Sequence, residues 1–468
     1  MQNKEKLRLL FITYTYSNGG GAEAVLTNLV NNIDPEKYIV SVFEIVNYNV
    51  KKEPLNSNVE FLGSLYSLSD PRSIRRTWES VLEQKPEIIR SLRRLDADVV
   101  ITWNYQMPSF MLPAFQDKKT IAWFHGAIDD LDIFALPELR VLPYYTRLQK
   151  KAWSKAGKII TISNHSMQSL KRVFPEYCAK TSIVYNGTQV DLIHKKAADS
   201  IDFNFSRYDF PFLICMGRLD ENKNFSLVIK SVAILKKQNI SCGLIIIGDG
   251  KENTKLRVLS KKEGVDDKVF FLGYKQNPLP YLREAKILCV SSLSEGFPTV
   301  VTEAMALGKP FVTTPVAGAS EELAYGGLCG LIAKWEPEDY AGKLQTLLSD
   351  DFLYESMSKK CIERIQKFSI HQTVFDFEKN LADLSEEKSS STEVLSYQDA
   401  QRFFKRYYLY SFYIYKMNIN KVFYRLHNIS TLKNFLILIY RLAEFFMHLI
   451  TTPIRCFSAH FIIKKYIK

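Results

Sequence analysis

Short apolar segments of strand length alternate with amphipathic helical segments along most of this chain. An apolar run at residues 7–16 precedes a helical segment that reaches about residue 32, and further strands are predicted near 99–103, 120–124 and 158–163. Repeated strand–helix units form parallel sheets that are covered by helices on both faces. The first part of the chain is therefore predicted to be a doubly wound α/β domain.

The same alternation starts again at residues 212–216, after a connection at about 185–210. Four more strands are predicted in this half, at residues 244–247, 269–272, 287–290 and 310–314. A chain of 468 residues is too long for one hydrophobic core. We therefore predict two doubly wound, Rossmann-like domains that face a ligand cleft, at residues 1–205 and 206–370, and a helix at 371–384 that returns to the first domain.

The cysteines and the first apolar run bear on the cellular compartment. Seven cysteines are scattered along the chain without any C-x-x-C spacing, which is typical of reduced thiols and favours neither a disulfide framework nor a zinc site. The run at 7–16 is short, contains Arg8 and lacks a small-residue cleavage site, so we interpret it as a strand and not as a secretory signal. A cytoplasmic protein is expected.

Almost all of the net charge of +12 lies at the C-terminal end. Residues 401–468 contain twelve Lys and Arg residues and one acid, Glu444, together with many aromatic residues, and a Ser-rich linker at 385–398 precedes them. We interpret residues 399–468 as a basic, aromatic, helical tail that binds an anionic membrane surface. A tail that packs on the first domain is the alternative, and RNA binding is disfavoured because no known module is present.

Charged residues and glycines follow several predicted strands of the second half. Gly217, Arg218 and Lys223 follow the strand at 212–216, and a cationic pair in such a loop can neutralise a diphosphate from two sides. A solvated surface pair is the alternative interpretation. Gly273 and Tyr274 end the strand at 269–272 in the same way.

Two glutamates lie eight positions apart around the end of the strand at 287–290. Gly296 and Pro298 interrupt the strand after Glu295, and a helix that Thr299 can cap is expected to begin there and to carry Glu303. Ligands of open α/β sheets bind at the carboxyl ends of the strands, where Glu295 is expected to lie. A glutamate near a helix start can also serve only to offset the helix dipole, which is the alternative interpretation.

Taken together, six short motifs resemble those of the family-4 retaining glycosyltransferases, which have the GT-B fold. The resemblance covers roughly residues 7–384. The motifs are G-G-A-E at 20–23, His125-Gly126, Asn186-Gly187, G-R-L-x3-K-N at 217–224, E-G-F-P-x4-E from Glu295 to Glu303, and V-A-G-A-S-E at 316–321.

This resemblance implies that the second domain binds a nucleotide sugar and the first domain binds the acceptor. Arg218 and Lys223 are then expected to bind the donor diphosphate and to stabilise its charge as the glycosidic bond breaks. Glu303 is expected to accept hydrogen bonds from the ribose, Glu295 to contact hydroxyls of the donor sugar, and His125 to lie near the anomeric carbon on the acceptor side. The implied catalytic set is Arg218, Lys223, Glu295 and His125.

The resemblance also implies a set of backbone contacts. Gly20 and Gly21 would let the first domain close over the phosphates, although the glycine run alone is equally consistent with a tight turn and is not a P-loop. The base is expected near Gly273 and Tyr274. The full expected donor site is Gly217, Arg218, Lys223, Gly273, Tyr274, Glu295, Gly296, Phe297, Pro298, Thr299, Val300 and Glu303.

The expected reaction is transfer of a sugar with retention of anomeric configuration, without a metal ion or cofactor, because Arg218 and Lys223 supply the positive charge. A UDP-sugar is favoured over a GDP-sugar as donor, and a lipid-linked saccharide or glycolipid as acceptor, in cell-surface polysaccharide assembly on the inner face of the membrane. A sugar-nucleotide epimerase and a non-catalytic partner subunit are the alternatives.

Overall fold

A computed structural model describes residues 5–16, 21–47, 54–67, 96–104, 107–115, 117–128 and 149–384. Gly20, the Ser-rich linker and the predicted basic tail lie outside the described residues. None of the helices in the described ranges is both long enough and apolar enough to cross a bilayer.

The first half of the chain contains a seven-stranded parallel sheet with the order β3-β2-β1-β4-β5-β6-β7. Its strands are β1 (Leu7–Thr13), β2 (Tyr38–Asn47), β3 (Val59–Ser67), β4 (Val99–Trp103), β5 (Lys119–Phe124), β6 (Lys158–Thr161) and β7 (Thr181–Ile183). The strand order reverses between β1 and β4, as it does in doubly wound folds.

The second half contains a six-stranded parallel sheet with the order β10-β9-β8-β11-β12-β13. Its strands are β8 (Phe212–Met216), β9 (Gly243–Ile247), β10 (Val269–Gly273), β11 (Ile287–Val290), β12 (Phe311–Thr313) and β13 (Gly330–Ile332). Every residue of β8, β9 and β11 is buried, because helices cover both faces of a parallel sheet. The predicted α/β class with two Rossmann-like sheets is confirmed.

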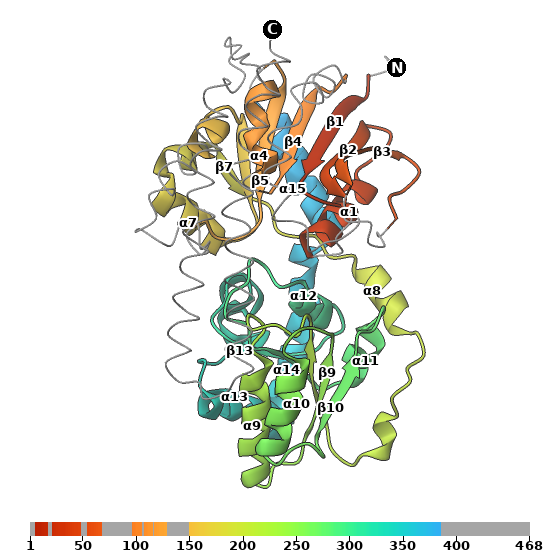
Figure 1. The fold of residues 1–468 in the computed structure, drawn as a ribbon, viewed down its shortest axis with the longest axis vertical. Coiled ribbons are helices and arrows are strands. Elements are labelled where there is room, and N and C mark those ends of the chain that lie inside the picture. Colours follow the sequence, from red (N-terminus) through yellow and green to blue (C-terminus); the bar gives the residue numbers. More distant parts are fainter. Residues whose placement is uncertain are drawn as a thin grey trace, which may run out of the picture.

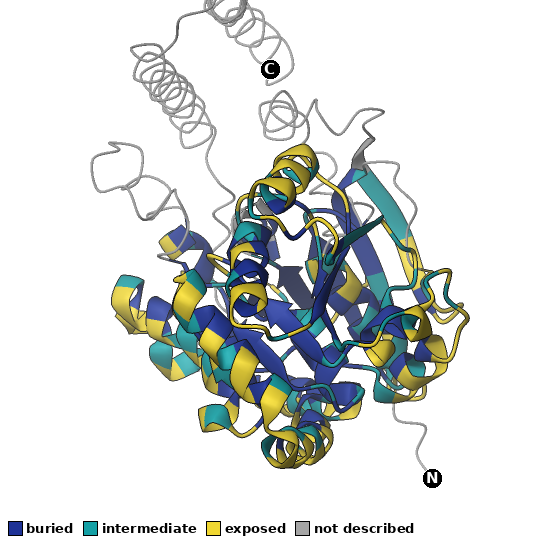
Figure 2. Ribbon diagram, turned by 90° about the horizontal axis from the view of Figure 1, so that it is seen from below, coloured by how far each residue is buried: buried dark blue, intermediate teal, exposed yellow. Residues whose placement is uncertain are grey.

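Helices connect the strands of each sheet and surround them (Figure 1). Among the described residues of the first half they are α1 (Gly21–Asn32), α4 (Met107–Phe110) and α7 (Asn164–Val173). In the second half they are α8 (Val190–Ala197), α9 (Phe225–Lys237), α10 (Asn253–Lys262), α11 (Leu279–Glu284), α12 (Thr299–Ala306), α13 (Pro337–Ser349) and α14 (Asp351–Ile365). The buried strands form the centre of the molecule and the exposed helix faces lie around them (Figure 2).

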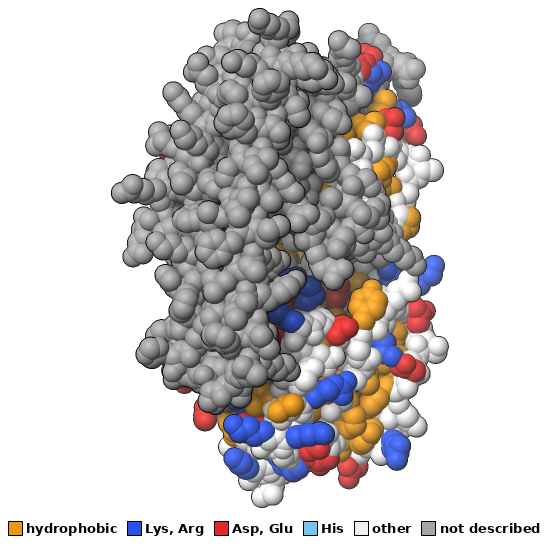
Figure 3. Space-filling view, in the orientation of Figure 1, with side chains coloured by type: hydrophobic (Ala, Val, Ile, Leu, Met, Phe, Trp, Pro, Cys, Tyr) orange, Lys and Arg blue, Asp and Glu red, His pale blue; other side chains and the backbone are white. Residues whose placement is uncertain are grey.

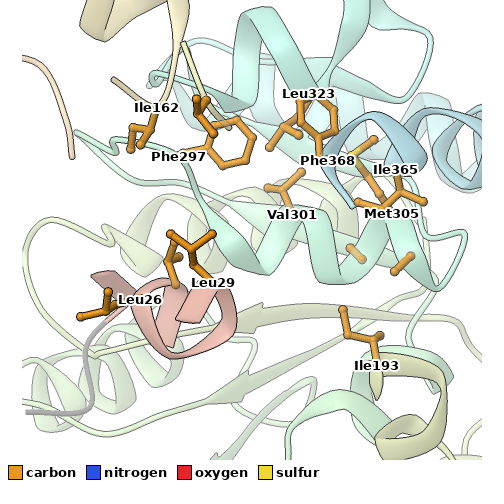
Figure 4. Packing of buried hydrophobic residues seen from close by; sticks show 14 of the residues in the cluster. Leu26, Leu29, Ile162, Ile193, Phe297, Val301, Met305, Leu323, Ile365 and Phe368 are labelled. Carbon is orange, nitrogen blue, oxygen red and sulfur yellow. The ribbon is translucent and has the colours of Figure 1, made fainter. Parts of the chain in front are cut away.

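Helix α12 lies where the two halves meet (Figure 1). Phe297, just before the helix, and Val301 and Met305 within it belong to a cluster of buried apolar side chains that also includes Leu26 and Leu29 of α1 (Figure 4). One apolar cluster therefore spans both halves, and α12 is packed within it.

Helix α15 (Ile370–Ala382) lies on the first sheet although it follows the second half in sequence. The ring of Phe377 packs 5.9 Å from that of Phe11 on β1 and 5.5 Å from that of Trp123 on β5, measured between centroids. Lys158 Nζ donates a 3.3 Å hydrogen bond to Asp383, just after the helix. The chain thus crosses between the halves a second time.

Candidate functional site

The loop after β8 places the Lys223 side chain over Gly217. Gly217 has a φ of +142°, and a Cβ atom at this position would lie 3.3 Å from Lys223 Cε. The loop after β9 is hydrogen-bonded to this turn, because Leu219 N donates to Asp249 O at 2.9 Å. A Cβ atom on Gly248 would lie 1.8 Å from Gly217 O, so only glycine fits there.

Lys223 and Glu295, which are 72 positions apart in sequence, form an ion pair in the structure. Lys223 Nζ lies 2.6 Å from Glu295 Oε1, and the two side chains are 19% and 14% exposed. Ser292 Oγ donates a second hydrogen bond to the same oxygen at 2.7 Å. The pair holds the lysine charge at the carboxyl edge of β8 and β11, which are neighbouring strands.

Arg218 lies on the same loop but outside this cluster. Its side chain is 82% exposed, and its guanidinium is 3.4 Å from Asp220 Oδ2. Lys223 is held against Glu295, whereas the Arg218 side chain extends into solvent. On the described face of the second half, positive and negative side chains are interspersed (Figure 3).

Helix α12 begins at Thr299, and Thr299 does not cap it. Pro298 occupies the N-cap position with an extended backbone, and no side chain caps the helix there. The prediction of a Thr299 cap was wrong because the helix starts one residue earlier than a Thr299 cap would require. Proline has no N–H, so within the expected segment Phe297, Thr299 and Val300 carry the backbone donors at this helix start. The Phe297 side chain is buried, with its ring centroid 5.8 Å from that of Tyr185.

Glu303 faces a cavity of about 460 Å³ between the two halves. The cavity is also lined by Asn28 and Asn31 of α1, by Lys196 of α8 and by Thr299. Desolvation raises the pKa of Glu303 to about 7, and the positive charge of Lys196 acts against this shift. A carboxyl group that lines a polar cavity of this size can bind hydroxyl groups.

His125 directly follows β5 and is surrounded by aromatic rings. Its ring centroid lies 4.3 Å from that of Trp103 and 6.3 Å from that of Trp123, with which it stacks. Burial lowers the pKa of His125 to about 3, so the imidazole is neutral near pH 7. Within the described part of the chain its Nε2 atom has no hydrogen-bond partner.

The His125–Gly126 turn meets the Glu295–Gly296 turn of the other half. A Cβ atom on Gly296 would lie 3.2 Å from Gly126 Cα. The structure therefore brings together three of the four predicted catalytic residues or their immediate neighbours, from opposite sheets. Gly21 opens α1, whereas Gly20 lies outside the described residues.

The remaining predicted residues lie at the end of β10. Gly248 N donates to Gly273 O at 2.9 Å, which joins the β9 and β10 loops. Tyr274 is 76% exposed, so its ring is available to a ligand. These positions remain predictions for the base.

Three polar residues near the site were not predicted from the sequence. Ser292 bonds Glu295, and Asn222 joins the two loops that carry Lys223 and Glu295. Glu322 is 3% exposed, and its Oε1 accepts a 2.5 Å hydrogen bond from Asn164 N at the start of α7. Burial raises the pKa of Glu322, and its Oε2 has no partner among the described residues. No sequence motif distinguishes these residues from ordinary loop polars.

Two protein-family models match the chain. The model for Glycosyltransferase Family 4 matches residues 19–192, and the model for Glycosyl transferases group 1 matches residues 199–368. Each model corresponds to one of the two sheets and its helices.

Characterised and uncharacterised relatives match over different lengths. The N-acetylgalactosamine-N,N'-diacetylbacillosaminyl-diphospho-undecaprenol 4-alpha-N-acetylgalactosaminyltransferase of Campylobacter jejuni is 29% identical over 218 residues, which are 46% of this chain and 57% of that enzyme. The alignment thus spans just over half of that relative. An uncharacterized glycosyltransferase of Haemophilus influenzae is 23% identical over 78% of this chain and 97% of its own length.

Solved structures match the fold over both halves. Anabaena Alr3699/HepE in complex with UDP superposes with a TM-score of 0.63 at 16% identity, over 81% of this chain and all of that chain. Sucrose-phosphate synthase from Thermosynechococcus elongatus superposes with a TM-score of 0.65 at 16% identity, over 81% and 99% of the two chains. At this identity the likeness concerns the fold alone.

Proposed function

This chain belongs to the family-4 glycosyltransferases and has their GT-B fold, and on that basis we propose that it transfers a sugar from a UDP-sugar to a lipid-linked saccharide or glycolipid, with retention of configuration. The donor lies on the second half and the acceptor on the first. The family and the fold agree with the resemblance stated from the sequence motifs.

The observation that carries this proposal is the Lys223–Glu295 pair beside the start of α12. A departing diphosphate is stabilised by a fixed cation and by backbone N–H groups at the positive end of a helix. Lys223 and the N–H groups of Phe297, Thr299 and Val300 supply both. Arg218 is free to swing from Asp220 to a bound phosphate, because it is exposed.

The cavity lined by Thr299 and Glu303 of α12 suits the nucleoside part of the donor. Glu303 lines it, and hydroxyl groups of a ribose donating to the carboxylate would stabilise its charged form. Glu295, whose Oε1 is engaged by Lys223 and Ser292, lies between the cavity-lining helix and the His125 turn, which suits a contact with the sugar.

His125 is proposed to contact the sugar or the acceptor as a neutral hydrogen-bonding group. A pKa of about 3 makes it a poor proton acceptor at pH 7. We therefore assign the proton of the acceptor hydroxyl to an oxygen of the departing diphosphate. The acceptor oxygen bonds to the anomeric carbon as the bond from that carbon to the diphosphate breaks, so no protein base is needed on that face. Glu295 and Glu303 therefore do not serve as a general acid and a general base.

The names of similar proteins support the substrate classes. The Campylobacter relatives act on undecaprenol-linked saccharides, another relative in Rhizobium meliloti is a lipopolysaccharide core glycosyltransferase, and the Anabaena structure binds UDP. The basic tail at 399–468 is proposed to hold the enzyme at the inner face of the membrane, near such an acceptor.

Thermal stabilisation of the full chain by nucleotide sugars tests the proposal. A donor that binds the folded state at a hundred times its Kd stabilises it by about 2.7 kcal/mol, which raises Tm measurably. We expect UDP-sugars to raise Tm more than GDP- or ADP-sugars, and the donor so found to be transferred to a polyprenyl-diphosphate saccharide. No shift with any nucleotide sugar would contradict the proposal.

A further inference from the structure

Asn222 joins the loop after β8 to the loop after β11. Its side-chain Nδ2 donates to Ser294 O at 2.9 Å, and its Oδ1 accepts from Ser294 N at 3.1 Å. Its backbone carbonyl accepts from Leu293 N at 2.7 Å. One residue thus makes three hydrogen bonds to two consecutive residues of the facing loop.

The two residues joined in this way immediately precede the ion pair. Asn222 precedes Lys223, and Ser294 precedes Glu295, so the hydrogen bonds between Asn222 and Ser294 lie one position from each charged residue. Other bonds hold the same loops: Ser291 Oγ donates to Lys223 O at 2.8 Å, and Trp335 Nε1 donates to Ser292 O at 3.0 Å. The separation of Lys223 and Glu295 is therefore set by backbone connections as well as by their own attraction.

An asparagine suits this place because its amide both donates and accepts. It can satisfy the C=O and the N–H of one residue at once, which a carboxylate or an apolar side chain cannot do. Neither Asn222 nor Ser294 is buried, so the bonds contribute little to the hydrophobic core. Their effect is on loop geometry.

We propose that Asn222 is a positioning residue, which fixes the Lys223 loop against the Glu295 loop so that both charges are aligned with the donor as the diphosphate departs. This inference rests on the proposed function. Removing the amide leaves both charged groups and the nucleoside cavity in place, so donor binding is largely retained. Misalignment of catalytic groups lowers the rate of the chemical step, so the loss falls on kcat.

The test is Asn222→Ala in the full chain, with the donor found by thermal stabilisation. We expect kcat to fall about tenfold while the donor KM changes less than about twofold, and Tm to stay close to that of the wild type. The matched control is Asn253→Ala, which removes an asparagine from the start of α10 that bonds Arg257 Nε and Asp249. We expect its kcat to match the wild type.

A double-mutant cycle separates positioning from a general effect on stability. If Asn222 acts through Glu295, Asn222→Ala lowers kcat much less in a Glu295→Gln background than in the wild type. Fully additive losses, or an unchanged kcat for Asn222→Ala beside an active wild type, would overturn this inference alone. A wild-type chain that transfers no sugar would overturn the proposed function and this inference with it.

If the alanine variant does not fold, Asn222→Ser provides the same comparison, because serine is too short to bond both groups of Ser294. A folded serine variant with wild-type kcat would contradict the positioning role. A reduced kcat with unchanged donor KM would support it.

Discussion

Burial shifts two side chains of the site toward their uncharged forms. The pKa of Glu303 is raised to about 7 and that of His125 is lowered to about 3, in both cases mainly by desolvation. The histidine is therefore neutral at pH 7, whereas the glutamate is partly protonated unless a ligand stabilises its charge. Of these two side chains, only Glu303 changes its charge in the physiological pH range.

The raised pKa of Glu303 predicts how stability varies with pH. The folded state holds the proton more tightly than the unfolded state, so ionisation of Glu303 costs stability as pH rises from its ordinary pKa of 4.5 to about 7. We expect unliganded Glu303→Gln to have a higher Tm than the wild type at pH 8 and a similar Tm at pH 4.5. The exposed Glu36→Gln is the control and should show no such difference, and a pH-independent offset for Glu303→Gln would refute the shift.

Lys223 is predicted to contribute through its charge. Lys223→Ala is expected to lower kcat/KM by at least about tenfold, or about 1.4 kcal/mol, because the diphosphate loses its fixed cation. Glu303→Ala is expected to cause a loss of at least that size. Steady-state transfer rates measure both, with the remote Lys360→Ala as control. Near wild-type rates in both variants would remove the site assignment.

At the scale of the element, the loops that follow β8, β9 and β10 contact one another at the carboxyl end of the second sheet. The β9 loop packs beneath Gly217 and bonds Leu219 and Gly273, so the conformation of the Lys223 loop depends on its neighbours. Gly248, in the loop after β9, therefore affects the conformation of the loop that carries Lys223.

Gly248→Ala is predicted to disturb this edge. The added Cβ would meet Gly217 O at 1.8 Å, and the φ of +140° is unfavourable for alanine, so we expect a loss of at least about 2 kcal/mol and weaker donor binding. Gly342→Ala in α13, where a Cβ meets no atom within 4 Å, should be neutral or stabilising. Urea unfolding and UDP titration of both variants measure this, and equal behaviour would contradict the packing argument.

At the scale of the whole molecule, the halves are joined by apolar packing around α12 and by a partly buried polar contact. Glu322, from the second half, accepts from Asn164 N at the start of α7, where a negative charge interacts favourably with the helix dipole. Arg364 Nε donates to Glu322 O at 3.0 Å and holds the segment.

The Glu322 contact predicts different effects for two substitutions. Glu322→Ala leaves the Asn164 N–H without its partner and should cost about 1–3 kcal/mol. Glu322→Gln keeps an oxygen acceptor and removes a buried charge, so its stability should be within about 1 kcal/mol of the wild type. Urea unfolding compares them, and equal losses would show that the hydrogen bond is not the cause.

The basic tail predicts membrane association. Each Lys or Arg near an anionic leaflet contributes about 1 kcal/mol, so the full chain should sediment with vesicles that contain anionic lipid and be released by high salt. A chain that ends at Ser390 should stay in the supernatant. Neutral vesicles are the control, and undiminished binding of the shortened chain would remove the membrane hypothesis.

Local patterns predicted most of the elements because they depend on neighbours in sequence. Strands β8, β9 and β11 were predicted as short apolar runs, and all of their residues are buried. Strands β3, β7 and β13 were not predicted. Strands β7 and β13 have three residues each, and so short a segment has no periodicity and is defined by its pairing, with β6 and β12 respectively.

The sequence by itself determined the α/β class, the two sheets, the family and the positions of Lys223, Glu295 and Glu303, since spacing within loops and helices is a local property. Only the tertiary structure decided that Lys223 pairs with Glu295, that Glu303 lines a cavity with α1 and that the His125 ring packs against two tryptophans. These features join residues far apart in the chain, and both pairing and desolvation depend on which surfaces the fold brings into contact.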